Sequence, residues 1–196
     1  MSYVSELVYG FSKLGDVALS KNNLAWSSPT WSDVFKVEFD LIINKQIPGS
    51  WKNLLHMTTG ADGGASGRIP AIFLINNEIY PCFHVNGNGN YYKVFKFDLN
   101  QQYHFVISQQ YNSDGEAIYV ININGEDFDK IINTTPKNFT DVKLYLSDNW
   151  YDTFGPYGKL SNLKFADLRS QPKPQGKHSF LFLLSSSKTL LPVSFQ

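Results

Sequence analysis

The sequence predicts an all-β domain, and three observations carry this prediction. Aromatic residues make up 15% of the 196 residues, and Phe and Tyr favour the pleated, half-buried surface of a sheet. The chain contains 17 Asn and 14 Gly, which is a turn-rich composition. About a dozen short apolar stretches follow one another at a spacing of roughly 8 to 12 residues, and no stretch shows a helical period. This pattern is typical of a sandwich or barrel of antiparallel strands.

Residues 34–43 show the clearest alternation of apolar and polar side chains, which predicts a strand with one buried face. Residues 116–123 are apolar on both faces, so we expect this strand inside a sheet rather than at its edge. The residues that we expect between the two sheets are Phe35, Val37, Phe39, Leu41, Ile121 and Leu144.

Other strands are delimited by turn residues. Asn76-Asn77, the run 86–90 and Asn124-Gly125 are the strongest turns, because Asn and Gly tolerate the backbone angles of tight hairpins. Between and around them we expect strands over residues 53–59, 69–75, 79–85, 91–99, 103–109, 127–132, 142–146 and 159–166.

The character of the chain changes after residue 168. A Pro/Gly/Lys stretch over 171–177 precedes a Ser- and Leu-rich end, so we expect one domain over 1–168 and a tail over 169–196 outside the fold. The apolar segments of this tail could dock on the domain or on a protein partner, or remain disordered. No apolar run approaches the roughly 20 residues of a membrane helix, and residues 1–20 lack the apolar stretch of a secretory signal. We expect no transmembrane segment.

Charge and cysteine content exclude several function classes. Lys+Arg and Asp+Glu both number 17, so no strong electrostatic attraction to nucleic acid or to an anionic membrane is expected. The single cysteine, Cys82, permits no intrachain disulfide and no cysteine-built metal site. It lies in a predicted strand, where a small buried hydrophobe is the expected role. The four histidines have no ligand spacing.

Catalytic patterns are incomplete. Glu38 and Asp40 share one strand face, as in some retaining glycosidases, but these enzymes carry a second glutamate further along the same strand, because the nucleophile and the acid must lie about 5 Å apart. The next positions on that face are Ile42 and Asn44, so we expect no enzyme and a solvated outer face. The glycine-rich loop 60–68 lacks the terminal Gly-Lys-Ser/Thr of a phosphate loop.

Asn-rich turns beside aromatic residues suggest a carbohydrate site, because amides bind sugar hydroxyls and aromatic rings cover apolar sugar faces. We expect the loops 60–67, 86–90 and 147–157 to meet at one rim of the sandwich. There the ligand-binding residues would be Asn86, Asn88, Asn149, Trp150 and Tyr151. Asp62 and Asp148 would share a calcium ion through oxygen ligands. The alternative is that Trp150 faces inward, Asn88 merely completes a turn, and the rim binds nothing. Two N-glycosylation patterns begin at Asn133 and Asn138.

Five motifs follow one another along the chain: Trp51, Asn53, Leu55, His56 and Thr58; Arg68, Pro70, Ala71, Ile72 and Phe73; Val85 to Tyr91; Asp148, Trp150 and Tyr151; and Gly158, Leu160, Asn162 and Leu163. In this order they resemble a laminin-G-like, concanavalin A-like jelly-roll domain of the kind found in extracellular proteins of marine invertebrates. The resemblance covers roughly residues 5–168.

The resemblance implies a two-sheet antiparallel jelly-roll sandwich in an extracellular protein. Such domains have no agreed enzymatic activity, and they bind glycans, matrix proteins or calcium, or act as spacers. The implied function is a non-catalytic, lectin-like module that recognises a glycan or glycoprotein surface. The alternative is a structural component that docks through the sandwich and the tail.

Two departures from the family pattern bear on these expectations. The family often pairs a cysteine at the position of Cys82 with one near Tyr92, and Tyr92 removes that bridge. It also often places Asp just before the Arg, where this chain has Gly67, which would weaken a rim calcium site.

Overall fold

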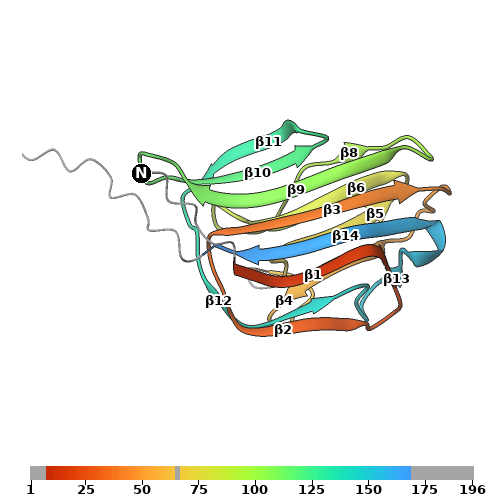
Figure 1. Cartoon of the computed structure of the whole chain (residues 1–196), viewed down its shortest axis with the longest axis horizontal. Helices are drawn as coiled ribbons and strands as arrows, with labels where there is room; N and C mark the ends of the chain where they lie inside the picture. The colour runs from red at the N-terminus through yellow and green to blue at the C-terminus, as the bar shows by residue number, and fades with distance from the viewer. Residues whose placement is uncertain (1–7, 65–66, 169–196) are drawn as a thin grey trace, which may run out of the picture.

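The structure is a computed structural model that describes residues 8–64 and 67–168. It consists of two sheets packed face to face (Figure 1). The six-stranded sheet runs, in spatial order, through β1 (Val8–Val17), β14 (Gly158–Asp167), β3 (Phe35–Ile43), β9 (Gln102–Tyr111), β10 (Ala117–Ile123) and β11 (Glu126–Asn133). The eight-stranded sheet runs through β2 (Leu24–Trp31), β12 (Phe139–Tyr145), β4 (Lys52–Thr58), β5 (Ala71–Ile75), β6 (Glu78–Val85) and β7 (Asn88–Tyr92). Two short strands complete it: β8 (Phe95–Lys96) beside β6, and β13 (Asp152–Thr153) beside β4.

The strands pair antiparallel, apart from the parallel contact of β13 with β4. Within the described residues, helical structure is confined to the 3-10 turn η1 (Gly155–Tyr157), and no helix there is long and apolar enough to span a membrane. The predicted all-β, two-sheet antiparallel jelly-roll sandwich is therefore confirmed.

The core lies between the sheets, where aromatic rings from both sides meet. Phe83 of the eight-stranded sheet stacks on Tyr119 of the six-stranded sheet with ring centroids 5.2 Å apart. It also packs against Phe35, at 4.9 Å. All six residues predicted for this core are completely buried, which confirms the prediction: Phe35, Val37, Phe39, Leu41, Ile121 and Leu144.

The strands β1 and β2 were not predicted from the sequence. They are the edge strands of the two sheets, and most of the described side chains on both are exposed or half-buried. An edge strand that covers little of the core needs no strict apolar alternation, so its pattern is weak. Pro29 within β2 fits such a position, because proline cannot donate to a central ladder.

The expected strand over 91–99 is wrong in its extent. The turn after β6 consists of Asn86 and Gly87 alone, with φ angles of 52° and 78°, as a two-residue hairpin requires. Asn88 to Asn90 therefore belong to β7 rather than to the turn, and residues 93–94 separate β7 from β8.

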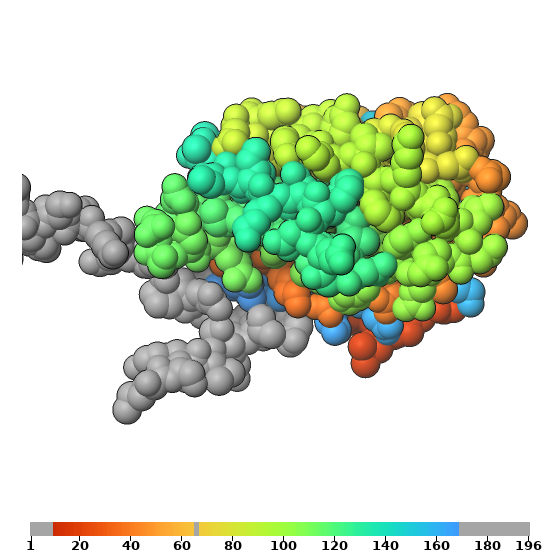
Figure 2. Space-filling view, turned by 90° about the horizontal axis from the view of Figure 1, so that it is seen from above, coloured from red at the N-terminus to blue at the C-terminus, as the bar shows by residue number. Residues whose placement is uncertain are grey.

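Seen from above, the turquoise strand β11 lies beside the green segment that contains β7 and β8 (Figure 2). The Tyr91 hydroxyl donates to the Asp129 carboxylate across this edge, at 2.7 Å. The Phe95 and Phe128 rings meet edge to face at 5.4 Å. These contacts close one side of the sandwich. The predicted tail over 169–196, with its protein partner, lies outside the described residues.

Candidate functional site

A hollow of about 340 Å³ lies on the outer face of the eight-stranded sheet. Successive side chains of a strand point to opposite faces of the sheet, so every second residue of β5, β6 and β7 points away from the core and can line the hollow. The residue Trp51 precedes β4, while Arg68 and Tyr151 come from the flanking loops. The lining residues are Trp51, Arg68, Phe73, Tyr80, Cys82, Asn90, Tyr92 and Tyr151.

One side of the hollow is a row of three aromatic rings that crosses the strands. Tyr80 lies between Trp51, at a centroid distance of 4.9 Å, and Tyr92, at 5.4 Å. The outer two rings remain accessible, since Trp51 is 40% exposed and Tyr92 is 46% exposed. Phe73, which is 2% exposed, packs edge to face against Trp51. The row thus offers aromatic surface to a ligand.

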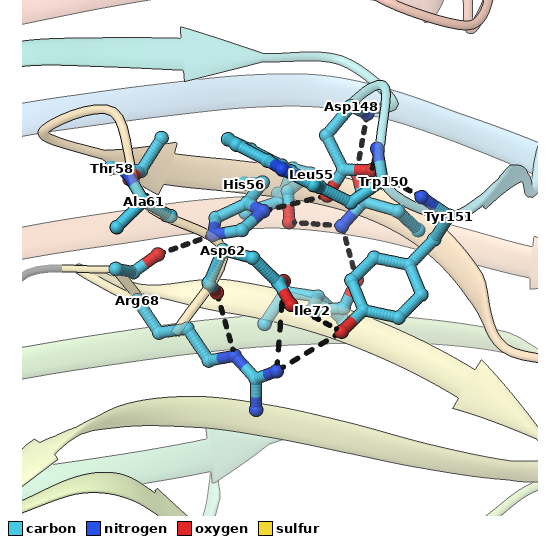
Figure 3. A network of polar contacts seen from close by, with 12 residues as sticks. Leu55, His56, Thr58, Ala61, Asp62, Arg68, Ile72, Asp148, Trp150 and Tyr151 are labelled. Carbon is cyan, nitrogen blue, oxygen red and sulfur yellow. Dashed lines mark hydrogen bonds and ion pairs between the residues drawn. The ribbon is translucent and has the colours of Figure 1, made fainter. Parts of the chain in front are cut away.

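The other side is polar and centres on Arg68 (Figure 3). Its guanidinium lies 4.8 Å from the centre of the Phe73 ring. The Nε atom donates to the Asp62 carbonyl at 3.2 Å, Nη2 donates to the Tyr151 hydroxyl at 3.3 Å, and Nη1 donates to Asn90 Oδ1. The Tyr151 hydroxyl in turn donates to Asp62 Oδ2 at 2.9 Å. Arg68 therefore joins the loop 60–67, the loop 147–157 and strand β7.

A buried His–Asp pair holds the two loops in place. The His56 and Asp148 side chains are both fully buried, and Nδ1 lies 2.6 Å from Oδ2. The other ring nitrogen, Nε2, faces the Gly67 carbonyl. His56 thus contacts both loops, one through each ring nitrogen.

Asp148 also sets the turn that carries Tyr151. Its Oδ1 accepts from the backbone N–H groups of Trp150, at 3.1 Å, and Tyr151, at 2.9 Å. The Asp148 N–H donates to the buried Asn53 side chain at 2.9 Å. The motif residues Asn53, His56 and Asp148 thus act through position: they fix the wall of the hollow without lining it.

Gly67 is required by the packing of its loop. A Cβ atom at this position would lie 2.2 Å from the Gly63 carbonyl oxygen, which is far inside van der Waals contact. The aspartate that the family resemblance would place here cannot fit without a shift of the loop backbone.

Burial and hydrogen bonds keep Cys82, Tyr80 and Tyr151 of the hollow neutral. Burial raises the pKa of the Cys82 thiol to about 12, so this cysteine is not a nucleophile at neutral pH. The hydrogen bond to Glu78 raises the pKa of Tyr80 to about 12. Burial and the bond to Asp62 raise the pKa of Tyr151. Both tyrosines therefore act as hydroxyl donors.

The predicted site residues are only partly brought together. Tyr151 lines the hollow, and the loops 60–67 and 147–157 meet through its bond to Asp62. Asn149 is exposed on the same turn. Trp150 is 39% exposed and packs over His56 at 5.4 Å rather than into the hollow.

Asn86 and Asn88 do not line the hollow. The Asn86 side chain accepts from the Thr134 N–H at 2.7 Å and from its hydroxyl at 2.9 Å, so it ties the hairpin to the end of β11. Asn88 Oδ1 accepts from the Asn90 N–H at 2.9 Å, within strand β7. The side-chain oxygens of both residues therefore accept hydrogen bonds from backbone N–H groups.

The residues proposed for calcium do not fit the ion. Both oxygens of Asp148 are occupied by protein donors inside the fold. In Asp62, Oδ2 accepts from Tyr151, and Oδ1 lies 3.8 Å from the Arg68 guanidinium, whose positive charge opposes a cation there. In residues 8–64 and 67–168, no group of three or more His, Cys, Asp or Glu side chains could hold a metal.

Sequence reasoning missed most of the hollow, namely Trp51, Arg68, Phe73, Tyr80 and Tyr92. Its aromatic members lie at every second position of neighbouring strands, so the alternation that locates the core also marks this face. That pattern could have indicated the face, once the strand order was known.

The outer face of the six-stranded sheet carries Glu38 and Asp40. Partial burial opposes their charge, but Lys36 and Lys164 around Glu38, and Asn162 and His104 around Asp40, outweigh it and lower both pKa values. A carboxyl with a lowered pKa is ionised at neutral pH and cannot supply the proton that glycosidase chemistry needs.

Fold and site together define a β-sandwich with an aromatic hollow on one outer face. No family model and no curated protein matches the chain. Among solved structures, it is similar to the binding domain of botulinum neurotoxin serotype D, with a TM-score of 0.53, 10% identity, and coverage of 83% of this chain and 42% of that one. It is also similar to the binding domain of botulinum neurotoxin DC in complex with rat synaptotagmin II, with a TM-score of 0.46, 17% identity and coverage of 70% and 32%. The chain thus spans less than half the length of these neighbours, and the likeness concerns the fold.

Proposed function

We propose that this chain is a non-catalytic carbohydrate-binding module whose glycan binds in the aromatic hollow. The observation that carries the proposal is the row of Trp51, Tyr80 and Tyr92 beside the polar group of Arg68, Asn90 and Tyr151. A hollow of this size, mostly aromatic with a few converging polar groups, is the usual form of a small-ligand site.

A pyranose ring suits this arrangement because it has two kinds of surface. Its apolar face presents C–H groups, which the negative face of an aromatic ring attracts. Its hydroxyls lie at the edge, where they can meet the donors and acceptors of Asn90 and Tyr151. The sandwich shared with a neurotoxin binding domain is compatible with a binding role. An extracellular location is part of the proposal and rests on the family resemblance described above.

The test is a glycan array followed by titration of the best ligand against wild type and two tryptophan variants. Trp51 and Trp150 have nearly equal exposure, 40% and 39%, but only Trp51 lines the hollow. We expect Trp51→Ala to weaken binding at least about tenfold, as loss of an aromatic anchor does. Trp150→Ala serves as the matched control, and both variants are checked by thermal melting.

Two results would contradict the proposal. One is the absence of any glycan ligand. The other is loss of binding in Trp150→Ala with full binding in Trp51→Ala, which would favour the loop-rim site predicted from the sequence. Chelation of divalent cations should leave binding unchanged, because no Asp or Glu among the described residues lines the hollow.

A further inference from the structure

We infer that the hollow binds neutral glycans in preference to acidic ones, an inference that rests on the proposed function. A single arginine among aromatic rings would ordinarily indicate a carboxylate ligand, because guanidinium pairs with carboxylates in a two-pronged geometry. The contacts of Arg68 argue against this, for three separate reasons.

The first reason is charge. Arg68 is the one charged residue among the eight that line the hollow, and its Nη2 already lies 3.8 Å from Asp62 Oδ1. The side chains are 15% and 38% exposed, respectively, so the attraction between them is only partly screened by solvent. A ligand carboxylate would meet a compensated pair and would approach the like charge of Asp62, which is unfavourable.

The second reason is that the N–H donors of Arg68 are already used by other protein groups. A guanidinium has five N–H groups, and three nitrogens of Arg68 already donate to Asp62, Asn90 and Tyr151. Nη2 faces two oxygens, those of Tyr151 and Asp62 (Figure 3). The paired donors that would hold a ligand carboxylate are therefore not open unless one of these contacts is displaced.

The third reason lies on the aromatic side of the hollow. The Tyr80 hydroxyl is directed to Glu78, at 2.7 Å, so a second carboxylate borders the row. Lys96 lies 4.0 Å from Glu78 but is 84% exposed, where solvent and salt screen its charge. Hydroxyls of a neutral sugar can donate to oxygens in this setting, whereas a negative group is opposed from both ends.

The experiment compares matched pairs of oligosaccharides that differ in one acidic group. Suitable probes are lactose against 3′-sialyllactose, and a neutral xylo-oligosaccharide against its glucuronate-substituted form, tested on an array and then by titration. We expect the neutral member of each bound pair to bind at least about tenfold tighter, as like-charge repulsion would produce.

The variant Asp62→Asn sharpens the test, because an amide can still accept from Tyr151 but no longer balances Arg68. Its preference for neutral over acidic probes should fall several-fold. The matched control is Asp127→Asn, which removes one charge from a half-exposed carboxylate on β11 that pairs with Lys130. This control should keep the wild-type preference.

The outcomes separate the inference from the proposed function. Tighter binding of the acidic probes that is lost in Arg68→Ala would overturn the inference and leave the carbohydrate site standing. An unchanged preference in folded Asp62→Asn would overturn it as well. If no member of any pair binds, both the inference and the proposed function fail.

Discussion

Each outer face of the sandwich carries one His–Asp pair, and the two pairs have almost the same geometry. His56 Nδ1 lies 2.6 Å from Asp148, on the eight-stranded sheet, and His104 Nδ1 lies 2.7 Å from Asp40, on the six-stranded sheet. Their surroundings differ completely. Both members of the first pair are fully buried, whereas the His104 side chain is 42% exposed.

The difference comes from what covers each sheet. The loops 60–67 and 147–157 lie over the first pair: His56 faces the Gly67 carbonyl of one loop, and Asp148 accepts from the Trp150 and Tyr151 N–H groups of the other. The second pair belongs to an open ladder of charges with Lys36, Glu38 and Lys164. The same two residue types therefore fix the wall of the hollow on one face and form part of a solvent-exposed charge network on the other.

The largest expected effect comes from cutting the buried pair. His56→Ala leaves the Asp148 charge inside the fold without its partner, which typically costs about 3–5 kcal/mol. We expect this loss in the free energy of unfolding measured with urea. Glycan binding should fall with it, since the turn of Tyr151 loses its support.

The same substitution on the other face is the control. His104→Ala should cost no more than about 1 kcal/mol, as exposed ion pairs do, and should leave glycan binding unchanged. Equal losses in the two variants would show that burial is not what distinguishes the faces.

A smaller effect is expected on the dependence of the free energy of unfolding on pH. Because the folded protein lowers the pKa values of Glu38 and Asp40, their charged forms stabilise the fold above their unfolded pKa values. This contribution disappears as the pH falls through the lower, folded values. Wild type and a Glu38→Gln/Asp40→Asn variant should differ by at most about 1 kcal/mol per group at neutral pH.

The measurement is urea unfolding of both proteins between about pH 6 and pH 3, and the two curves should converge on acidification. A gap that widens instead would mean that the pKa values are raised. The variant should also show unchanged glycan binding. Hydrolysis of a β-glucan by wild type that vanishes in the variant would contradict the non-catalytic proposal.

The smallest effect extends the comparison to two asparagines that share the Asn-x-Thr glycosylation pattern. Asn133 is 2% exposed, and its amide donates to Gln109 at 2.7 Å and to the His84 carbonyl at 3.2 Å. Asn138 is exposed and accepts from the Asp33 N–H at 2.9 Å. A glycan fits Asn138 and is incompatible with the native position of Asn133.

Secretion of the full chain from eukaryotic cells tests this contrast. We expect one N-linked glycan, removed by peptide N-glycosidase and absent in Asn138→Gln, with the melting temperature nearly unchanged. Peptide mapping that finds the glycan on Asn133 of folded protein would contradict the structure at this edge.

The sequence allowed the fold to be predicted because strands inside the sheets, such as β3 and β10, bury one face completely. The alternation over 34–43, for example, corresponds closely to β3. The edge strands β1 and β2 bury too little to show such a pattern. The polar and aromatic residues of the loops around Asp62 and Tyr151 also led us to expect that these two loops meet. They do so through the hydrogen bond from the Tyr151 hydroxyl to Asp62.

The aromatic hollow could not be derived in the same way. Most of its rings belong to β5, β6, β7 and the residue before β4, and they become neighbours only through the strand order of the eight-stranded sheet. Asn86 and Asn88 were misleading because an amide that satisfies backbone groups has the same sequence appearance as one that faces a ligand.

Cys82 and Tyr92 are directly opposed across the β6–β7 hairpin, and both line the hollow. A cysteine at position 92 would stand where a covalent brace could tie this edge of the sheet, but the row would then lose its outermost ring. Position 92 thus separates two uses of the same hairpin, a disulfide that reinforces the sheet edge or an aromatic ring in the hollow, and a single base change separates the codons of tyrosine and cysteine. This chain has tyrosine there, so Tyr92→Cys asks directly whether the edge gains stability from a bridge to Cys82 while the hollow loses its outermost ring.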